Sequence, residues 1–338
     1  MRCTLLCLFF FFSADLIGSK VFSTFAKAPT TAKILFWTQV KSTNGKWNRE
    51  IYIMNPDGSQ HVNITNHRAD DIEPMWSPTG RQILFSSDRI RVRDLYLMDT
   101  DGANVKRVFT KVAERQHPTW SPDGKQIAYQ RRELDGWFIY TATIDGKNEK
   151  QIVRGTRPDW SPDGTEIAFM TGQLGHNRIW LLNLRTEKQR QLLPEDAIPW
   201  MRWPAWSPTG DKIAFSWLNH FPFVGFFGKQ TIYIINRDGT GLKQIVNEAG
   251  PRADSPVWSP SGDALIYDQL DKNNHGQIFK IPLDHDQPEQ LTHIESWSRA
   301  NDWFDPAYAL PVSPQPELLT TTWGKLKIQQ NSSLSHLN

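Results

Sequence analysis

Short apolar runs separated by polar turn residues recur along this chain in a fixed order. One run ends in a Trp, the next has the form of Gln126-Ile127-Ala128-Tyr129, and the third is rich in β-branched and aromatic residues, as in Thr231-Ile232-Tyr233-Ile234-Ile235. Runs of this length and composition predict β-strands. Asp-Gly pairs such as Asp101-Gly102 follow the third run and predict a hairpin into a fourth strand. The pattern therefore predicts repeated units of four strands.

A Trp-Ser-Pro-x-Gly motif marks these units. Its Trp residues stand at positions 76, 120, 160, 206 and 258, so the steps between them are 44, 40, 46 and 52 residues. Pro at the second position of a four-residue turn presets φ, and Gly at the fourth accepts a positive φ, so the motif predicts a tight turn between the first two strands. Four strands in a repeat of about 40 to 50 residues are typical of a β-propeller blade.

The first and last units complement each other. Lys33-Ile34-Leu35-Phe36-Trp37 resembles a second strand, yet no motif precedes it, whereas Trp303 follows Trp258 by 45 residues and is continued by Phe304-Asp305-Pro306 in place of the turn. We expect residues 301–304 to pair with the N-terminal segment, which removes the free sheet edge. The chain is thus predicted to form an all-β, six-bladed propeller of four-stranded antiparallel blades over residues 27–306.

The two ends differ from the repeats. Residues 1–26 contain Arg2, an apolar run from Leu5 to Phe12 and small residues up to Ala26, which predicts a signal peptide and export to the periplasm or the exterior. The alternative is an uncleaved anchor, but the apolar run is shorter than the roughly 20 residues that a spanning helix needs. Residues 307–338 are expected to form an extended, partly disordered tail.

Charge and cysteine content restrict the function. The 38 Lys and Arg residues nearly balance the 36 Asp and Glu residues, so no footprint for nucleic acid is indicated. Both cysteines, Cys3 and Cys7, fall within the leader, so disulfides are not expected in the mature protein. We expect a monomer that touches a membrane only through its leader.

One ring of residues is predicted to line the top of the central channel. These residues stand three positions before each motif Trp and comprise Glu73, His117, Arg157, Trp203, Ser255 and Ala300. From this ring and its sequence neighbours we take as candidate binding residues Asp71, Glu73, Arg115, His117, Arg157, Arg202, Trp203, Asp254 and Arg299. Mixed charges at a channel mouth can hold an anionic ligand or the carboxylate-bearing end of a partner chain. The alternative is a set of hydrated charges that pair with one another.

An aromatic segment at 217–228 is the second candidate surface. It carries Trp217, Phe221, Phe223, Phe226 and Phe227 between the second and third strands of the fifth blade. Such a cluster forms either an exposed apolar patch for a partner or a small satellite core over the end of the blade.

Catalytic signatures are scarce. The sequence has no Gly-x-Ser-x-Gly elbow, no His-Glu-x-x-His and no phosphate-binding glycine loop, and its nine His residues lack metal-ligand spacing. His117 with Glu73 is the one conceivable acid–base pair, and a channel His hydrogen-bonded to a neighbour is the alternative. We therefore expect no cofactor and no metal.

The repeat resembles that of the TolB-like propeller family. Pro stands two residues before Trp in five copies, at Pro74, Pro118, Pro158, Pro204 and Pro256, and Trp-Ser-Pro-[Asp/Thr/Ser]-Gly follows. The resemblance covers nearly all of residues 33–306. It implies an exported, non-catalytic module that binds a protein or peptide through its top face and channel mouth. Similar blades occur in saccharide lyases and in peptidases, so a polysaccharide lyase or hydrolase with its site in the channel is the alternative.

Overall fold

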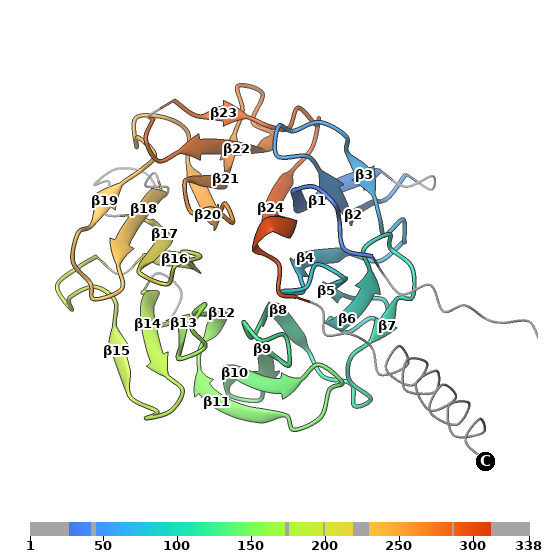
Figure 1. Ribbon diagram of the computed structural model, residues 1–338, viewed down its shortest axis with the longest axis horizontal. Helices are drawn as coiled ribbons and strands as arrows, with labels where there is room; N and C mark the ends of the chain where they lie inside the picture. Colours follow the sequence, from blue (N-terminus) through green and yellow to red (C-terminus); the bar gives the residue numbers. More distant parts are fainter. Residues whose placement is uncertain are drawn as a thin grey trace, which may run out of the picture.

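Six four-stranded antiparallel sheets stand around a common axis, as Figure 1 shows. The computed structural model describes residues 27–41, 45–172, 176–198, 200–218, 230–285 and 287–311. The predicted all-β propeller with six blades is confirmed, and the helical content of the described residues is one 3-10 turn at Pro306–Tyr308. The expected leader 1–26 and most of the expected tail lie outside the described residues.

Each blade runs from an inner to an outer strand, and the blades are numbered here from the N-terminal one. Blades 1 to 3 consist of β24 (Ser298–Phe304), β1 (Lys33–Lys41), β2 (Trp47–Met54) and β3 (Val62–Asn63); β4 (Asp71–Trp76), β5 (Gln82–Ser87), β6 (Asp94–Asp99) and β7 (Lys106–Arg107); and β8 (Arg115–Trp120), β9 (Gln126–Glu133), β10 (Gly136–Thr143) and β11 (Lys150–Arg154). Blades 4 to 6 consist of β12 (Thr156–Trp160), β13 (Glu166–Thr171), β14 (Arg178–Asn183) and β15 (Gln189–Gln191); β16 (Met201–Trp206), β17 (Lys212–Trp217), β18 (Thr231–Asn236) and β19 (Lys243–Gln244); and β20 (Ala253–Trp258), β21 (Ala264–Leu270), β22 (Gly276–Pro282) and β23 (Glu289–Gln290).

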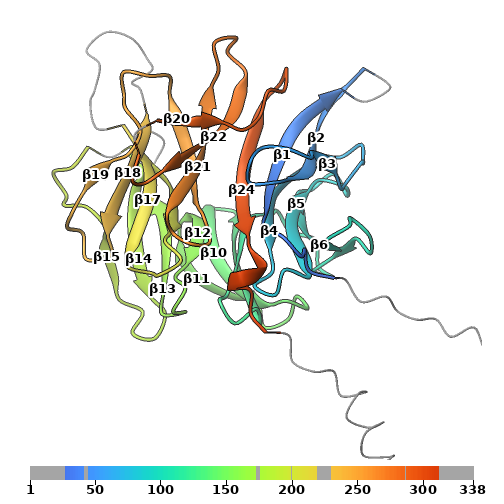
Figure 2. The same cartoon turned by 45° about the horizontal axis from the view of Figure 1, so that its top comes forward.

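The ring is closed within blade 1 by strands from opposite ends of the propeller. β24 pairs antiparallel with β1, with Trp303 opposite Ile34 and Ser298 opposite Thr38. Figure 2 shows the two strands side by side, although about 260 residues separate them in the sequence. The predicted closure is confirmed, and the closing strand begins three residues earlier than the pattern indicated.

The motif Trp residues lie at the junctions between blades. Trp76, Trp120, Trp206 and Trp258 are all less than 9% exposed and belong to core clusters that join neighbouring sheets. The indole N–H of Trp258 donates to the carbonyl of Ala205 in the preceding blade, at 3.0 Å. Large aromatic side chains supply much buried area, so these residues hold blade to blade.

The motif turns also touch one another around the ring. A Cβ built on Gly124 would lie 3.7 Å from Cδ of Pro78 in the preceding blade, which is ordinary contact. At the closure, where the motif proline is missing, the ring of Phe304 takes its place, and a Cβ on Gly80 would clash with its Cζ. Phe304 also packs against Trp76, with ring centroids 5.5 Å apart. One aromatic ring thus fills the joint between blades 1 and 2.

We expect Gly80→Ala to destabilise the propeller more than Gly124→Ala. Both glycines have a φ near 70°, so each substitution incurs the left-handed backbone penalty of about 1 kcal/mol, but only the first adds a clash with Phe304. Thermal unfolding followed by circular dichroism should give a lower Tm for Gly80→Ala. The difference should shrink when Phe304→Ala is present in both variants, and equal Tm values in the wild-type background would contradict this account of the joint.

Candidate functional site

β-Bulges in the inner strands turn one side chain per blade toward the axis. In β4 the pairing with β5 shifts between Ile72 and Met75, and Glu73 in the shifted segment has a φ of 57°. The same left-handed backbone occurs at the equivalent residues of the next four blades: His117, Arg157, Trp203 and Ser255, with φ between 50° and 56°. Non-glycine residues adopt this conformation at a cost of about 1 kcal/mol or more, so the fold holds these side chains in place.

In five of the six inner strands, the backbone N–H of the ring residue donates to a side chain of the preceding blade. Glu73 accepts from His117 N–H at 2.8 Å, and Gln130 accepts from Arg157 N–H at 3.1 Å. The N–H groups of Trp203, Ser255 and Ala300 donate to Met170 Sδ, Ser216 Oγ and Asp268 Oδ1. Buried N–H groups need such partners, so at these five positions one blade completes the inner strand of the next.

A cavity of about 300 Å³ lies on the axis and is lined by all six residues of the predicted ring. A second layer of lining residues, which sequence reasoning missed, stands one position before each motif Trp: Met75, Thr119, Asp159, Ala205, Val257 and Asp302. Side chains two positions apart on a strand share a face, and this alternation was the available signal. The cavity therefore has a polar and aromatic upper layer and a mixed lower layer.

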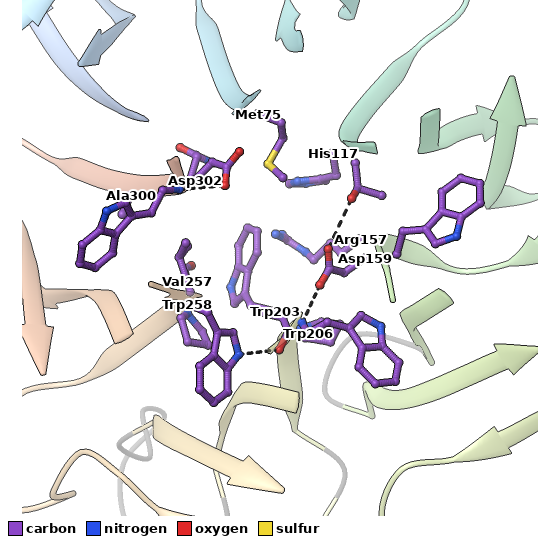
Figure 3. A pocket seen from close by; sticks show the side chains of 18 of the residues that line it. Met75, His117, Arg157, Asp159, Trp203, Trp206, Val257, Trp258, Ala300 and Asp302 are labelled. Carbon is purple, nitrogen blue, oxygen red and sulfur yellow. Dashed lines mark hydrogen bonds between the residues drawn. The ribbon is translucent and has the colours of Figure 1, made fainter. Parts of the chain in front are cut away.

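Trp203 lies in the middle of the upper layer, beside Arg157 (Figure 3). The guanidinium carbon of Arg157 is 3.2 Å from the indole centroid, and that of Arg299 is 4.5 Å away. His117 meets the same indole edge to face, with centroids 5.5 Å apart. Cations stacked on an indole face are stabilised by its quadrupole, so Trp203 organises the charged groups around it.

Glu73 and His117 form a tightly held pair. The Glu73 carboxylate is 2.9 Å from Nδ1 of His117 and also accepts from Ser86 Oγ at 2.7 Å. Burial opposes ionisation of Glu73, but the charge of protonated His117 and these hydrogen bonds lower the pKa of Glu73 to about 2. Burial lowers the pKa of His117, although Glu73 acts in the opposite direction. The Glu73 carboxylate is thus already engaged by hydrogen bonds from His117 and Ser86.

Most charges at the channel mouth are paired. Arg299 contacts Asp268 at 2.7 Å, and Asp254 is 3.8 Å from Arg202 and 2.7 Å from Arg252. Arg157 differs from these arginines, since no carboxylate among the described residues lies within ion-pair distance of it. Burial, together with Arg202, lowers the pKa of Arg157 to about 9, so the guanidinium remains charged at neutral pH.

Residues 23–156 and 133–308 match the family model of the TolB beta propeller domain. The chain belongs to this TolB propeller family. The family resemblance inferred from the repeated Pro-x-Trp-Ser-Pro motif is therefore confirmed. No curated protein matches the chain.

Solved structures share this TolB-type fold at low identity. TolB from Acinetobacter baumannii has a TM-score of 0.68 and 18% identity over 83% of this chain and 68% of its own. A putative TolB from Agrobacterium tumefaciens has a TM-score of 0.62 and 18% identity over 81% and 94%, respectively. Hydrazine synthase of Kuenenia stuttgartiensis has a TM-score of 0.66 and 12% identity, with 86% of this chain matching 49% of that one. At these identities the likeness is one of fold.

Four candidate residues of the predicted channel mouth do not line the cavity of this TolB-type propeller: Asp71, Arg115, Arg202 and Asp254. Arg202 and Asp254 pair with each other, and the other two are held by buried ion pairs. Asp71 and Arg115 are both fully buried, and Asp71 pairs with Arg89 at 2.7 Å. Arg115 contacts Asp94 at 3.0 Å and Glu149 at 2.9 Å. Both stand at the first position of an inner strand, before the bulge, and the bulge interrupts the alternation that would otherwise point them toward the axis.

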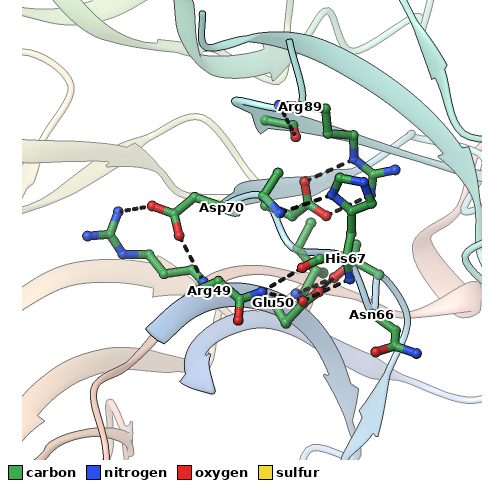
Figure 4. Close-up of polar contacts among 12 residues, drawn as sticks. Arg49, Glu50, Asn66, His67, Asp70 and Arg89 are labelled. Carbon is green, nitrogen blue, oxygen red and sulfur yellow. Dashed lines mark hydrogen bonds and ion pairs between the residues drawn. The ribbon is translucent and has the colours of Figure 1, made fainter. Parts of the chain in front are cut away.

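Similar polar networks join blades 1 and 2 on the outside of the channel. In Figure 4, Arg49 approaches Asp70, at 3.2 Å, and Glu50 accepts a hydrogen bond from the N–H of His67 at 2.9 Å. Burial raises the pKa of Glu50 despite these bonds. Buried acids with several donors stabilise the junctions, so their presence here is structural.

The second candidate surface is described only at its first residue. Trp217 ends β17, is 8% exposed, and donates its indole N–H to the carbonyl of Ile198 at 2.9 Å. It also packs edge to face on Tyr233, so it belongs to the core of blade 5. Phe221, Phe223, Phe226 and Phe227 lie outside the described residues.

Two searches of the described residues bear on membranes and metals. No helix in them combines the length and apolar character needed to cross a bilayer. Within the same residues, no group of three or more His, Cys, Asp or Glu side chains is placed to hold a metal ion.

We expect Arg115→Met to destabilise the protein by about 3–5 kcal/mol, because it leaves the buried Asp94 carboxylate without its cation and removes one of the two arginines that pair with Glu149. Urea unfolding should show the loss as a lower midpoint. Arg154→Met is the control, since Arg154 is 61% exposed and only 3.4 Å from Asp135 on the surface. Equal midpoints for the two variants would contradict a structural role for Arg115.

Asp302 should make the stability depend on pH. Its carboxylate accepts from Trp76 N–H at 2.6 Å, and burial raises its pKa to about 7. The folded chain then keeps a proton that the unfolded chain releases near pH 4, so this stabilisation is complete below about pH 4 and is lost as the pH rises through 7.

Asp302→Asn keeps an acceptor for Trp76 but does not titrate. We expect the variant to exceed the wild type in unfolding free energy at pH 8 by on the order of 1–3 kcal/mol, with a smaller gain at pH 5. Urea titrations at the two pH values measure the difference. A constant difference between the proteins at both pH values would show that Asp302 is ionised throughout.

Proposed function

We propose that this protein is exported and acts as a non-catalytic module that binds a protein or peptide at the channel mouth and top face. The observation that carries the proposal is the preformed cavity of about 300 Å³ on the axis. Its upper side chains are fixed by bulged backbone and by bonds from neighbouring blades. Little order is lost when a ligand enters a site held in this way, which favours binding.

The composition of the upper layer fits a docking site for a short segment. Binding energy in protein interfaces concentrates on Trp, Tyr and Arg, and here the guanidinium groups of Arg157 and Arg299 both contact the indole of Trp203. Ligand cavities start at about 300 Å³. A cavity of this size accommodates one or two side chains or a chain end, so a partner would insert a small element and rest the remainder on the top loops.

Binding is favoured over catalysis by the state of the His–carboxylate pair that lines the cavity, Glu73 with His117. Glu73 already accepts from Ser86 and from His117, and its pKa of about 2 makes it a weak base. Burial lowers the pKa of His117. His117 is also packed edge to face on Trp203. The pair thus supports the cavity wall.

Export rests on the sequence of residues 1–26, with its basic start, apolar run and small residues. Membership of the TolB propeller family is in line with an envelope location. The partner is then a protein or peptide of the same compartment, and a saccharide is the alternative ligand.

A capture experiment tests the function. Full-length protein is immobilised and exposed to the exported proteins of its own source, in parallel with Trp203→Ala and with Lys125→Ala, whose exposed side chain lies in a motif turn on the opposite face. We expect a partner that binds the wild type and Lys125→Ala alike and is lost at least about 10-fold with Trp203→Ala, because a buried aromatic anchor is worth 2 kcal/mol or more.

The same preparations decide between binding and catalysis. A partner retained equally by Trp203→Ala would contradict a site in the channel. Turnover of a polysaccharide by the wild type, abolished in a Glu73→Gln, His117→Gln, Arg157→Gln triple variant that remains folded, would replace the binding function with an enzymatic one.

A further inference from the structure

Three hydrogen-bond donors in the upper layer of the cavity are buried and unused. They are Nη1 of Arg157, Nε1 of Trp203 and Oγ of Ser255, and none of them has a partner among the described residues. All three residues line the cavity and belong to the consecutive blades 4, 5 and 6. A buried donor without a partner is unfavourable because it has lost its hydrogen bonds to water. Unpaired donors also occur elsewhere in the propeller, as at Nε1 of Trp76 and the hydroxyl of Tyr267, but these three belong to residues that line one cavity, which favours a ligand with acceptor atoms.

The charges around the cavity point in the same direction. Glu73 is bonded to His117, Arg299 to Asp268, and Asp254 to Arg202 and Arg252. Arg157 is the cation of this region that has no carboxylate within ion-pair distance among the described residues. Its guanidinium carbon lies 3.2 Å from the indole centroid of Trp203.

We propose that the ligand of this cavity presents a carboxylate, which pairs with the guanidinium of Arg157 beside the indole of Trp203. This inference rests on the proposed binding function and names the chemistry of its anchor. A planar carboxylate matches the fork of a guanidinium, and its single charge balances the one left by Arg157. A dianion such as a phosphate monoester would exceed that balance and would face the Glu73 carboxylate.

The lower layer does not compete for Arg157. Asp159 and Asp302 line the cavity below, but their carboxylates accept from the backbone N–H groups of Trp206 and Trp76. Burial raises the pKa of Asp159 to about 6 and that of Asp302 to about 7. Asn301 also lines the cavity, and its side-chain oxygen has no partner among the described residues.

The carboxylate can be the end of a chain or the side chain of Asp or Glu. Four probes separate these sources: N-acetyl-trialanine and its C-terminal amide, and N-acetyl-glutamate N-methylamide and its glutamine counterpart. Each probe is titrated at millimolar concentration into the ¹⁵N-labelled full chain, and the indole N–H signal of Trp203 is assigned by comparison with Trp203→Phe.

We expect at least one acid to shift the Trp203 signal in a saturable manner, while its matched amide does not. Arg157→Met should weaken that binding at least about 10-fold, because a charge-assisted hydrogen bond is lost. Arg154→Met, which changes an exposed arginine outside the cavity, should bind as the wild type does.

Stability supplies an independent readout. Arg157→Met removes a buried charge that has no counter-ion, so it should raise the Tm of the free protein by a few degrees. Arg115→Met, which removes a buried and paired arginine, should lower it. The comparison of acids with amides on the wild-type chain tests the inference even if a variant does not fold.

Three results would overturn the carboxylate site: acids and amides that act alike, no probe that shifts the Trp203 signal, or Arg157→Met that binds as well as the wild type. A partner that is lost with Trp203→Ala but retained by Arg157→Met would leave the binding module intact and remove only the carboxylate anchor. A partner that is retained by both Trp203→Ala and Arg157→Met would instead contradict the proposed function itself.

Discussion

The pairing of β24 with β1 is the constraint on which the rest of the molecule depends. A blade buries its faces only against its two neighbours, so an open ring would expose two apolar sheets and two strand edges. The register that places Trp303 opposite Ile34 pairs the strand edges and at the same time covers the apolar faces of the sheets. It also brings Phe304 into the gap left by the missing motif proline, against Gly80. The cavity on the axis exists because the sixth inner strand arrives from the far end of the chain.

The ring holds two kinds of arginine. Arg115 lies between sheets, where Asp94 and Glu149 surround it, and its charge is part of the fold. Arg157 lies on the axis, where the fold supplies an indole face but, among the described residues, no carboxylate within ion-pair distance. The strained backbone that holds Arg157 there adds to the cost of leaving it unpaired. Costs of this kind concentrate at sites that meet a ligand.

The sequence was sufficient for the architecture because the motif is local. Trp, Pro and Gly at fixed spacing specify a strand end and a turn whatever surrounds them, so blade number, strand order and the closing strand near Trp303 could be predicted. The ring of residues that lines the upper cavity followed from the same spacing. Asp71 and Arg115 were assigned to the mouth because they are close in sequence to ring residues, and a regular strand would place residues two positions apart on the same face. The bulge that interrupts it, with φ of 57° at Glu73, depends on pairing between strands and has no plain signature in the residues. The same limit applies to contacts between side chains that are distant in sequence. Nothing in the sequence indicates that Arg157 stacks on Trp203 or that Arg299 forms an ion pair with Asp268.

The hydrogen bonds that link the inner strands of adjacent blades have a consequence for how such a protein changes over time. The acceptor for Arg157 N–H is Gln130 of the preceding blade, and that for Ser255 N–H is Ser216. Such a blade therefore supplies an acceptor that the inner strand of its neighbour needs. A duplicated or transplanted repeat would lie beside an acceptor that was selected for a different residue. A donor residue in one blade and its acceptor in the preceding blade should therefore change together during evolution. The unit that evolves together then includes parts of two adjacent sheets and does not coincide with one four-stranded blade.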